Sequence, residues 1–343
     1  MSRIAVRRSL KRWPAVAALC AAFPTLALIG LLASEAVAQA NSGRSLDGVV
    51  QVTAHVPNDA RTASSLGTRR DGTGVVIDSN GLILTIGYLI LEASEVEIGG
   101  VSPEPVPARI VAYDHESGFG LLRAAQPLDV APIPLGVSGD VDRTQPMMVV
   151  SRAGEFDAAG VYVVDRRDFA GYWEYLLEDA IFTAPPHAQF GGAALISRDG
   201  RLVGIGSLFV NDAATRERPI PGNMFVPVDH LKPIMADLLT RGRRADPGRP
   251  WLGVTLEEHR GRVFVQRVSP DGPAAAAGIA PSDLILGIDG VQVNGLADFY
   301  RKLWSQGEAG VDVPLDVLQG IGVGSVVVKS SDRYRYLRLN PTY

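Results

Sequence analysis

The sequence predicts a mainly β protein with two domains. Short β-prone runs separated by turn residues recur between Val49 and Ser207, which is typical of a sandwich or a barrel. These runs do not alternate with helical patterns, so a parallel α/β sheet is not expected. Residues 240–250, TRGRRADPGRP, are polar and rich in Gly and Pro, as exposed linkers are. We therefore expect a first domain over 41–239 and a second over 251–343.

The periodicity of the apolar residues predicts each element. Residues 49–55 alternate as a strand, and 58–70 form a polar loop. One helix is expected at 296–304 and another at 228–239, where one face carries Leu231, Met235, Leu238 and Leu239. Further strands are expected at 74–77, 82–85, 96–98, 108–113, 120–124, 147–151, 161–165, 180–183, 194–196 and 202–207, and in the second domain at 253–256, 263–268, 284–288, 313–318, 325–329 and 334–339.

The composition is that of a globular protein with many turns. The 343 residues are 46% hydrophobic, with 37 Gly and 23 Pro, and can build two cores without metals or disulfides. The single Cys20 cannot form an internal disulfide. No pattern for a bound cofactor is present, and none is expected.

Residues 1–40 have the three parts of an export signal. A basic head is followed by an apolar run over 13–33 and by small residues that end at Ala40. The run is also long enough for an uncleaved anchor in the inner membrane, which stays the alternative. Cleavage after Ala40 would leave 28 Lys and Arg against 36 Asp and Glu, a net charge of −8. A surface this acidic argues against sequence-independent binding of nucleic acids.

Three segments carry a resemblance to a known family. Residues 72–78, GTGVVID, with Gly81 and Thr85, form an expected hairpin, and residues 114–122 read DHESGFGLL. Residues 189–195, QFGGAAL, are followed by RLVGI at 201–205. In this order the segments resemble the HtrA (DegP-like) envelope serine proteases. The resemblance implies a chymotrypsin-like double β-barrel followed by a PDZ domain.

The same segments depart from the family at each catalytic position. Tyr88 stands in the place of the histidine, Gly118 in that of the aspartate, and Gly191 in that of the serine. Triad chemistry needs a nucleophile, a base that titrates near neutral pH, and an anion that orients the base. A phenol with a pKa of about 10 is a poor base, and glycine supplies neither of the other groups. We therefore expect no catalytic residues at these positions, and loss of enzyme activity is the hypothesis that follows.

Other residues near the three positions offer weaker candidates for catalysis. His115 and His187 precede the aspartate and serine positions, and we expect both to be exposed loop residues. Ser117 and Ser197 are likewise interpreted as turn or surface hydroxyls, although a peptidase built on non-family residues would use such groups. No H-E-x-x-H or paired-cysteine spacing is present, so no metal site is expected.

Residues 169–177, FAGYWEYLL, contain an unusually high density of aromatic side chains. Core packing is the simpler interpretation, and the alternative is a partner-binding surface or a lining for the vacated cleft. The strand expected at 161–165 precedes it.

The second domain keeps the features of a PDZ domain. Residues 250–254, PWLGV, resemble the carboxylate-binding loop and the start of the strand to which a peptide adds, and residues 269–290 match the PDZ consensus. Such domains hold a C-terminal carboxylate on backbone N–H groups and extend their sheet with the peptide. The residues predicted to bind peptide are Trp251, Leu252, Gly253, Val254, Phe299, Tyr300 and Leu303. A PDZ domain that only packs against its own barrel or a neighbouring subunit is the alternative.

The sequence thus favours an exported, catalytically inactive HtrA-like protein of the periplasm or cell envelope. Through its PDZ domain it is expected to bind peptides or unfolded envelope proteins, or to scaffold or regulate a partner. Its expected partners are peptides or protein C-termini, and further copies of itself or an active homologue in an oligomer. Contact with the membrane is expected only if residues 1–40 stay attached. The alternatives are an active serine endopeptidase that uses other residues, and a structural subunit of an envelope complex.

Overall fold

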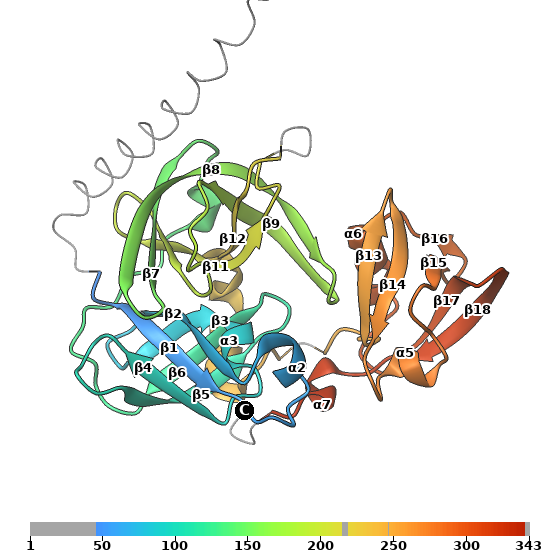
Figure 1. The fold of residues 1–343 in the computed structure, drawn as a ribbon, viewed down its shortest axis with the longest axis horizontal. Coiled ribbons are helices and arrows are strands. Elements are labelled where there is room, and N and C mark those ends of the chain that lie inside the picture. The colour runs from blue at the N-terminus through green and yellow to red at the C-terminus, as the bar shows by residue number, and fades with distance from the viewer. Residues whose placement is uncertain (1–45, 215–218, 246, 340–343) are drawn as a thin grey trace, which may run out of the picture.

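The computed structural model describes residues 46–339, apart from 215–218 and 246. The expected export signal therefore lies outside the described residues. Two closed barrels of six strands each are followed by a smaller antiparallel sheet (Figure 1). The mainly β prediction is confirmed. Among the described residues, no helix is both long and apolar enough to span a bilayer.

The first barrel is closed by its first and fourth strands. Its order is β1-β2-β3-β6-β5-β4, and β1 pairs with both β2 and β4. Short helices α2 (Ala63–Leu66) and α3 (Gly87–Ile90) interrupt the strands. The strands are β1 (Val49–His55), β2 (Arg69–Val76), β3 (Leu82–Ile86), β4 (Glu95–Gly99), β5 (Val106–Tyr113) and β6 (Phe119–Ala124).

The second barrel has the order β10-β11-β12-β9-β8-β7. A 3-10 turn, η1 (Ser138–Asp140), precedes it. Its apolar side chains form a core in which Val149, Ile181 and Phe225 are fully buried. The strands are β7 (Pro146–Arg152), β8 (Phe156–Gly171), β9 (Tyr175–Ala184), β10 (Ala194–Ile196), β11 (Leu202–Val210) and β12 (Gly222–Pro227).

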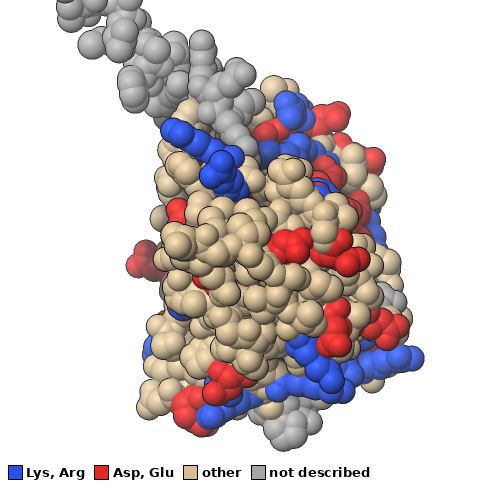
Figure 2. Space-filling view, turned by 90° about the vertical axis from the view of Figure 1, so that its right-hand side faces the viewer, with Lys and Arg blue, Asp and Glu red and all other residues tan. Residues whose placement is uncertain are grey.

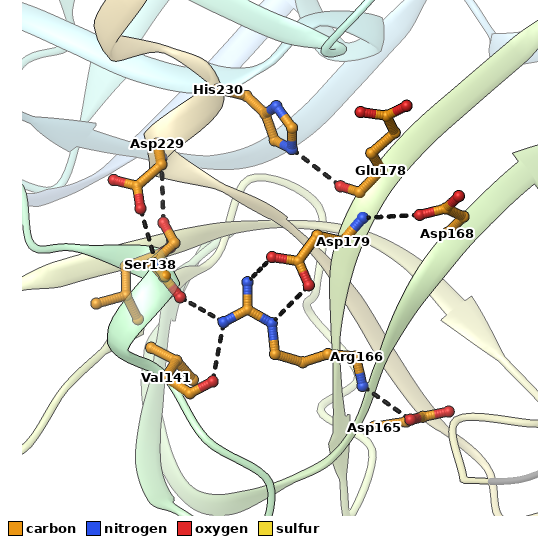
Figure 3. Close-up of polar contacts among 11 residues, drawn as sticks. Ser138, Val141, Asp165, Arg166, Asp168, Glu178, Asp179, Asp229 and His230 are labelled. Atoms are coloured by element: carbon orange, nitrogen blue, oxygen red, sulfur yellow. Dashed lines mark hydrogen bonds and ion pairs between the residues drawn. The ribbon is translucent and has the colours of Figure 1, made fainter.

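The hairpin formed by β8 and β9 is longer than the barrel needs, and its tip reaches the third sheet (Figure 1). Its strands are anchored near the barrel wall by Arg166 (Figure 3). This guanidinium donates to both carboxylate oxygens of Asp179 and to the carbonyl oxygens of Ser138 and Val141. The Nε2 atom of His230 lies 2.9 Å from the carbonyl oxygen of Glu178, the residue before Asp179. The base of the hairpin is therefore fixed by polar contacts, and only its tip projects.

The third sheet has the order β13-β14-β15-β17-β18, with β16 paired to β15. β13 is an edge strand, and α6 (Leu296–Trp304) lies beside it with Phe299, Tyr300 and Leu303 buried. The remaining elements are β13 (Val254–His259), β14 (Arg262–Val268), α5 (Pro273–Ala276), β15 (Leu284–Ile288), β16 (Val291–Gln292), β17 (Asp312–Gln319) and β18 (Gly322–Lys329).

Two expected elements are wrong in part. The helix expected at 228–239 begins only at α4 (Met235–Arg241), after two 3-10 turns, η2 (Val228–His230) and η3 (Lys232–Ile234). Pro233 has no N–H to donate, which interrupts the helical ladder. The strand expected at 334–339 is instead a short helix, α7 (Arg333–Tyr336), because Asp332 accepts the N–H of Tyr334 as a helix cap. The alternating Tyr and Arg residues there imitate a strand pattern.

Candidate functional site

Tyr88 and Gly191 lie against each other at the junction of the two barrels. Tyr88 belongs to α3, and its hydroxyl donates to the carbonyl of Ser207 in β11 at 3.0 Å. A Cβ atom added to Gly191 would lie 3.0 Å from that hydroxyl oxygen. The phenol therefore takes the space that a side chain at 191 would enter. Burial raises the pKa of Tyr88 well above its usual range, so the phenol stays protonated at neutral pH.

Gly118 lies at the start of α3. Its carbonyl accepts the N–H of Gly87 at 2.7 Å, and its φ of +85° is a conformation that side chains disfavour. The hydroxyl of Tyr175 donates to the carbonyl of Ser117 at 2.8 Å and would lie 3.3 Å from a Cβ at Gly118. A second phenol thus stands at the predicted aspartate position. The structure brings Tyr88, Gly118 and Gly191, the three expected triad positions, around one short helix.

The loop that carries Gly191 is tied to the hairpin that leads to Tyr88. The N–H of Thr73 donates to the carbonyl of Gly191 at 2.9 Å, and the hydroxyl of Thr85 donates to the carbonyl of Thr73 at 2.7 Å. Gly192 has a φ of +77°, and a Cβ there would lie 2.0 Å from the carbonyl oxygen of Thr73. The close approach of the two segments therefore requires glycine at 192.

Asp114 forms a buried ion pair with the interdomain segment. Arg244 donates from two nitrogens to its carboxylate at 2.8 and 3.0 Å. Burial would raise the pKa of Asp114, but the hydrogen bonds and charge of Arg244 hold this pKa below its usual range. Residues 240–250 are therefore not only an exposed linker, since Arg244 docks against the first barrel and Arg249 pairs with Glu116 at 2.9 Å.

The residues considered as substitute catalytic groups have other partners. The hydroxyl of Ser117 is buried and donates to Asp114 at 2.5 Å, and that of Ser197 donates to Asp199 at 2.5 Å. His115 packs edge-on against Tyr334, with ring centroids 4.8 Å apart, and burial lowers its pKa to about 3. The expectation that His115 is exposed is wrong: its ring is half-buried, because Tyr334 packs against it and also donates to the carbonyl of Tyr113. Ser117 lies in a turn, as one of its two interpretations had it, but its hydroxyl is buried.

His187 is buried, which corrects the expectation of an exposed loop histidine. Its Nε2 lies 2.8 Å from the hydroxyl of Ser151, and its Nδ1 lies 3.8 Å from a carboxylate oxygen of Asp157. Ser151 and Asp157 face each other across the β7–β8 pair. This Ser–His–Asp arrangement was missed in the sequence, because nothing there marks Ser151 or places it beside His187. Ser151 is 0% exposed, so a substrate carbonyl has no direct path to its hydroxyl.

The predicted carboxylate-binding loop of the second domain holds a carboxylate of this chain. The N–H groups of Leu252, Gly253 and Val254 donate to the side chain of Glu174 at 2.9, 2.7 and 2.9 Å. Glu174 lies between β8 and β9 at the hairpin tip, within the aromatic stretch, and sequence reasoning did not single it out. Trp251 instead packs against Tyr336, with ring centroids 4.6 Å apart.

The opposite edge of the same sheet is exposed. Among the described residues, β18 pairs only with β17, and Ile321, Val323 and Val327 are exposed along it. Figure 2 views the molecule from the side of this domain, where residues other than Lys, Arg, Asp and Glu cover a broad area, with acidic residues beside it and basic residues along the lower edge. No group of three or more His, Cys, Asp and Glu side chains within the described ranges is placed to hold a metal ion.

Comparisons with known proteins agree with this architecture. Residues 72–205 match the family model of a trypsin-like peptidase domain, and residues 250–329 match that of a PDZ domain. The chain is 26% identical over 273 residues to Protease Do-like 1, chloroplastic, of Arabidopsis thaliana, which covers 73% of this chain and 61% of the relative. It is 26% identical to a probable periplasmic serine endoprotease DegP-like of Pseudomonas fluorescens, covering 72% of this chain and 53% of the relative. The chain thus spans little more than half the length of these relatives.

Solved structures give the same fold. The HtrA-type protease AlgW with decapeptide superposes with a TM-score of 0.52 at 19% identity, covering 89% of this chain and 99% of that one. The serine endoprotease from Yersinia pestis superposes with a TM-score of 0.52 at 21% identity, covering 86% of this chain and 97% of that one. The double barrel, the adjoining sheet and the two matched domain models lead to one description. The chain is similar to the HtrA- and DegP-type proteases, and its match to a trypsin-like peptidase domain is followed by its match to a PDZ domain.

Proposed function

We propose that this protein is a catalytically inactive HtrA-like protein that binds peptides or protein C-termini through its PDZ domain. The observation that carries the proposal is the contact of Tyr88 with Gly191. A protonated phenol stands where the base of a triad would act, and it fills the space of the nucleophile. With Tyr175 beside Gly118, nucleophile, base and orienting anion are all replaced.

The PDZ domain supports the binding role. Its loop presents three convergent N–H groups, and its edge strand β13 lies beside α6, the arrangement that lets a peptide add to the sheet. Leu252, Gly253 and Val254 would hold the carboxylate, while Phe299, Tyr300 and Leu303 would form the apolar wall of the groove. We also propose that the protein is exported into the periplasm or envelope, since residues 1–40 have the pattern of an export signal. Of the two relatives named above, one is described as chloroplastic and the other as probably periplasmic, which supports this proposal.

A fluorophosphonate probe and fluorescein-labelled casein test the inactivity. The chain without residues 1–40 is expected to show neither covalent labelling nor casein turnover above buffer. An active HtrA-type protease in parallel serves as the positive control. Labelling that maps to a serine, and that is lost when the protein is denatured by heat beforehand, would overturn the proposal.

The Ser151–His187–Asp157 contact favours one second candidate, a hydrolase built on these residues. The 2.8 Å contact between Ser151 and His187 has the geometry of a nucleophile and its base. Against it, Ser151 is fully buried, and its hydroxyl also donates to Gln189 at 3.2 Å. If labelling occurs, loss in Ser151→Ala and retention in Ser117→Ala would assign the activity to this group. The opposite pattern would assign it to Ser117.

A further inference from the structure

The tip of the β8–β9 hairpin places a carboxylate in the loop that would hold a peptide C-terminus. Both oxygens of Glu174 are used, one by the N–H of Leu252 and the other by the N–H groups of Gly253 and Val254. Gly253 has a φ of +81°, which turns consecutive N–H groups toward one point. A carboxylate that accepts several backbone N–H bonds forms a strong, charge-assisted contact.

The backbone of the hairpin continues the same binding mode along β13. The N–H of Leu256 donates to the carbonyl of Tyr172 at 2.8 Å. Val254 contacts Glu174, and Leu256, two residues further along β13, contacts Tyr172, two residues earlier in the hairpin. This opposed direction is that of an antiparallel strand added to the sheet edge.

The helix α6 holds the other side of the hairpin. The hydroxyl of Tyr300 donates to the carbonyl of Gly171 at 2.6 Å and accepts the N–H of Glu174 at 3.2 Å. Leu176 joins the buried apolar cluster of the PDZ domain, which includes Phe299 and Leu303. The hairpin therefore supplies the carboxylate, the paired backbone and the apolar side chain that a bound peptide would supply.

We infer that the PDZ groove is a binding site for this chain's own hairpin, with the Glu174 carboxylate in place of a peptide C-terminus. This inference rests on the proposed function and adds its regulation: a peptide or protein C-terminus binds only by displacing the hairpin. Because the hairpin is covalently linked to the PDZ domain, it competes at a high effective concentration. Its displacement frees the carbonyl of Tyr172 and the carboxylate of Glu174 from the groove together.

Hydrogen exchange measured by mass spectrometry tests the inference without any added peptide. In the chain that lacks residues 1–40, the amides of Leu252, Gly253, Val254 and Leu256 are expected to exchange slowly. Glu174→Ala is expected to speed their exchange at least tenfold, while the amides of β1 keep their wild-type rates. Glu178→Ala is the matched control, because Glu178 lies on the same hairpin and its side chain is exposed.

Two outcomes separate this inference from the proposed function. Unchanged exchange of the loop amides in Glu174→Ala overturns the inference, and it leaves the fluorophosphonate and casein results untouched. If Glu174→Ala also unprotects β1, the same measurement on Glu174→Gln decides. Gln keeps one acceptor oxygen but turns an NH₂ group toward the donors, so exchange intermediate between wild type and full release is expected. Wild-type rates in Glu174→Gln would then overturn the inference.

Discussion

Glu174 and Tyr175 are neighbours in the chain, yet their polar groups are bound by different domains. The carboxylate of Glu174 accepts the N–H of Gly253 at 2.7 Å in the PDZ domain, whereas the hydroxyl of Tyr175 donates to the carbonyl of Ser117 at 2.8 Å in the first barrel. Both side chains are buried. One hairpin tip therefore fills the PDZ loop and the predicted aspartate position at once, and a ligand that moves it acts on both.

Competition with Glu174 predicts a change in peptide affinity. The probe is fluorescein-labelled Gly-Tyr-Trp-Val with a free C-terminal carboxylate, which copies residues 171–173 and ends where Glu174 stands. Fluorescence anisotropy is expected to show at least tenfold tighter binding to Glu174→Ala than to wild type, because the intramolecular competitor is weakened. The same peptide with a C-terminal amide is the control and is expected to bind more weakly. Equal affinity of wild type and Glu174→Ala would argue against competition.

The close contact at Gly192 predicts a large loss of stability on substitution. Gly192→Ala would place a Cβ 2.0 Å from the carbonyl oxygen of Thr73, at a φ of +77°. Backbone must shift to admit it, so the free energy of unfolding is expected to fall by about 3 kcal/mol or more. Gly324→Ala is the control, since nothing lies within 4 Å of its added Cβ, and a change within about 0.5 kcal/mol is expected. Urea denaturation measures both, and similar midpoints would contradict the packing described.

The low pKa of His115 predicts how the free energy of unfolding depends on pH. Burial lowers its pKa to about 3, and the charge of Arg333 acts in the same direction. Since the unfolded chain has an ordinary pKa near 6.5, it binds more protons than the folded chain between these values. Stability is therefore lost as the pH falls from about 6.5 toward 3, by at most about 1.4 kcal/mol per pH unit from this group. The other charged or titratable groups around it are Asp114, Arg244, Arg249 and Tyr334.

The contribution of His115 is isolated by a variant that cannot titrate. His115→Phe keeps an aromatic ring against Tyr334 and is expected to lose less stability than wild type between pH 7 and pH 4.5. Thermal unfolding midpoints at several pH values measure the difference, and His259→Phe, at an exposed position, is the control. Parallel pH profiles for wild type and His115→Phe would show that this ring is not held neutral.

Local patterns predicted much of the fold but little of the hairpin contact. Strand β1 and helix α6 have the predicted bounds because alternating and helical periodicities are short-range signals. Glu174 had no such signal, since its partner Gly253 lies 79 positions further along the chain. The contact of Ser151 with His187 was missed for the same reason. Both arise where two distant segments are packed together, which a single sequence does not reveal.

The backbone at Gly118 predicts the outcome of rebuilding the triad. The triple variant Tyr88→His, Gly118→Asp, Gly191→Ser restores the three side-chain types that the family resemblance implies. We expect no casein turnover, because the φ of +85° at Gly118 and the hydroxyl of Tyr175, 3.3 Å from the added Cβ, oppose an aspartate aimed at the new histidine. Without that anion the imidazole is not held in the required tautomer and orientation.

Adding Tyr175→Phe separates the two obstacles at Gly118. The fourth change removes the hydroxyl but leaves the backbone at +85°. If the hydroxyl were the main obstacle, the fluorophosphonate probe would label the serine introduced at position 191 faster in the quadruple variant than in the triple variant. We expect equal, background labelling, since the conformation of residues 117–119 is held by the bond from Gly87 to the carbonyl of Gly118 and remains unsuited to the aspartate. Casein turnover by the triple variant itself would show that the scaffold around Gly118 has kept the geometry for catalysis, and that only the side chains were lost.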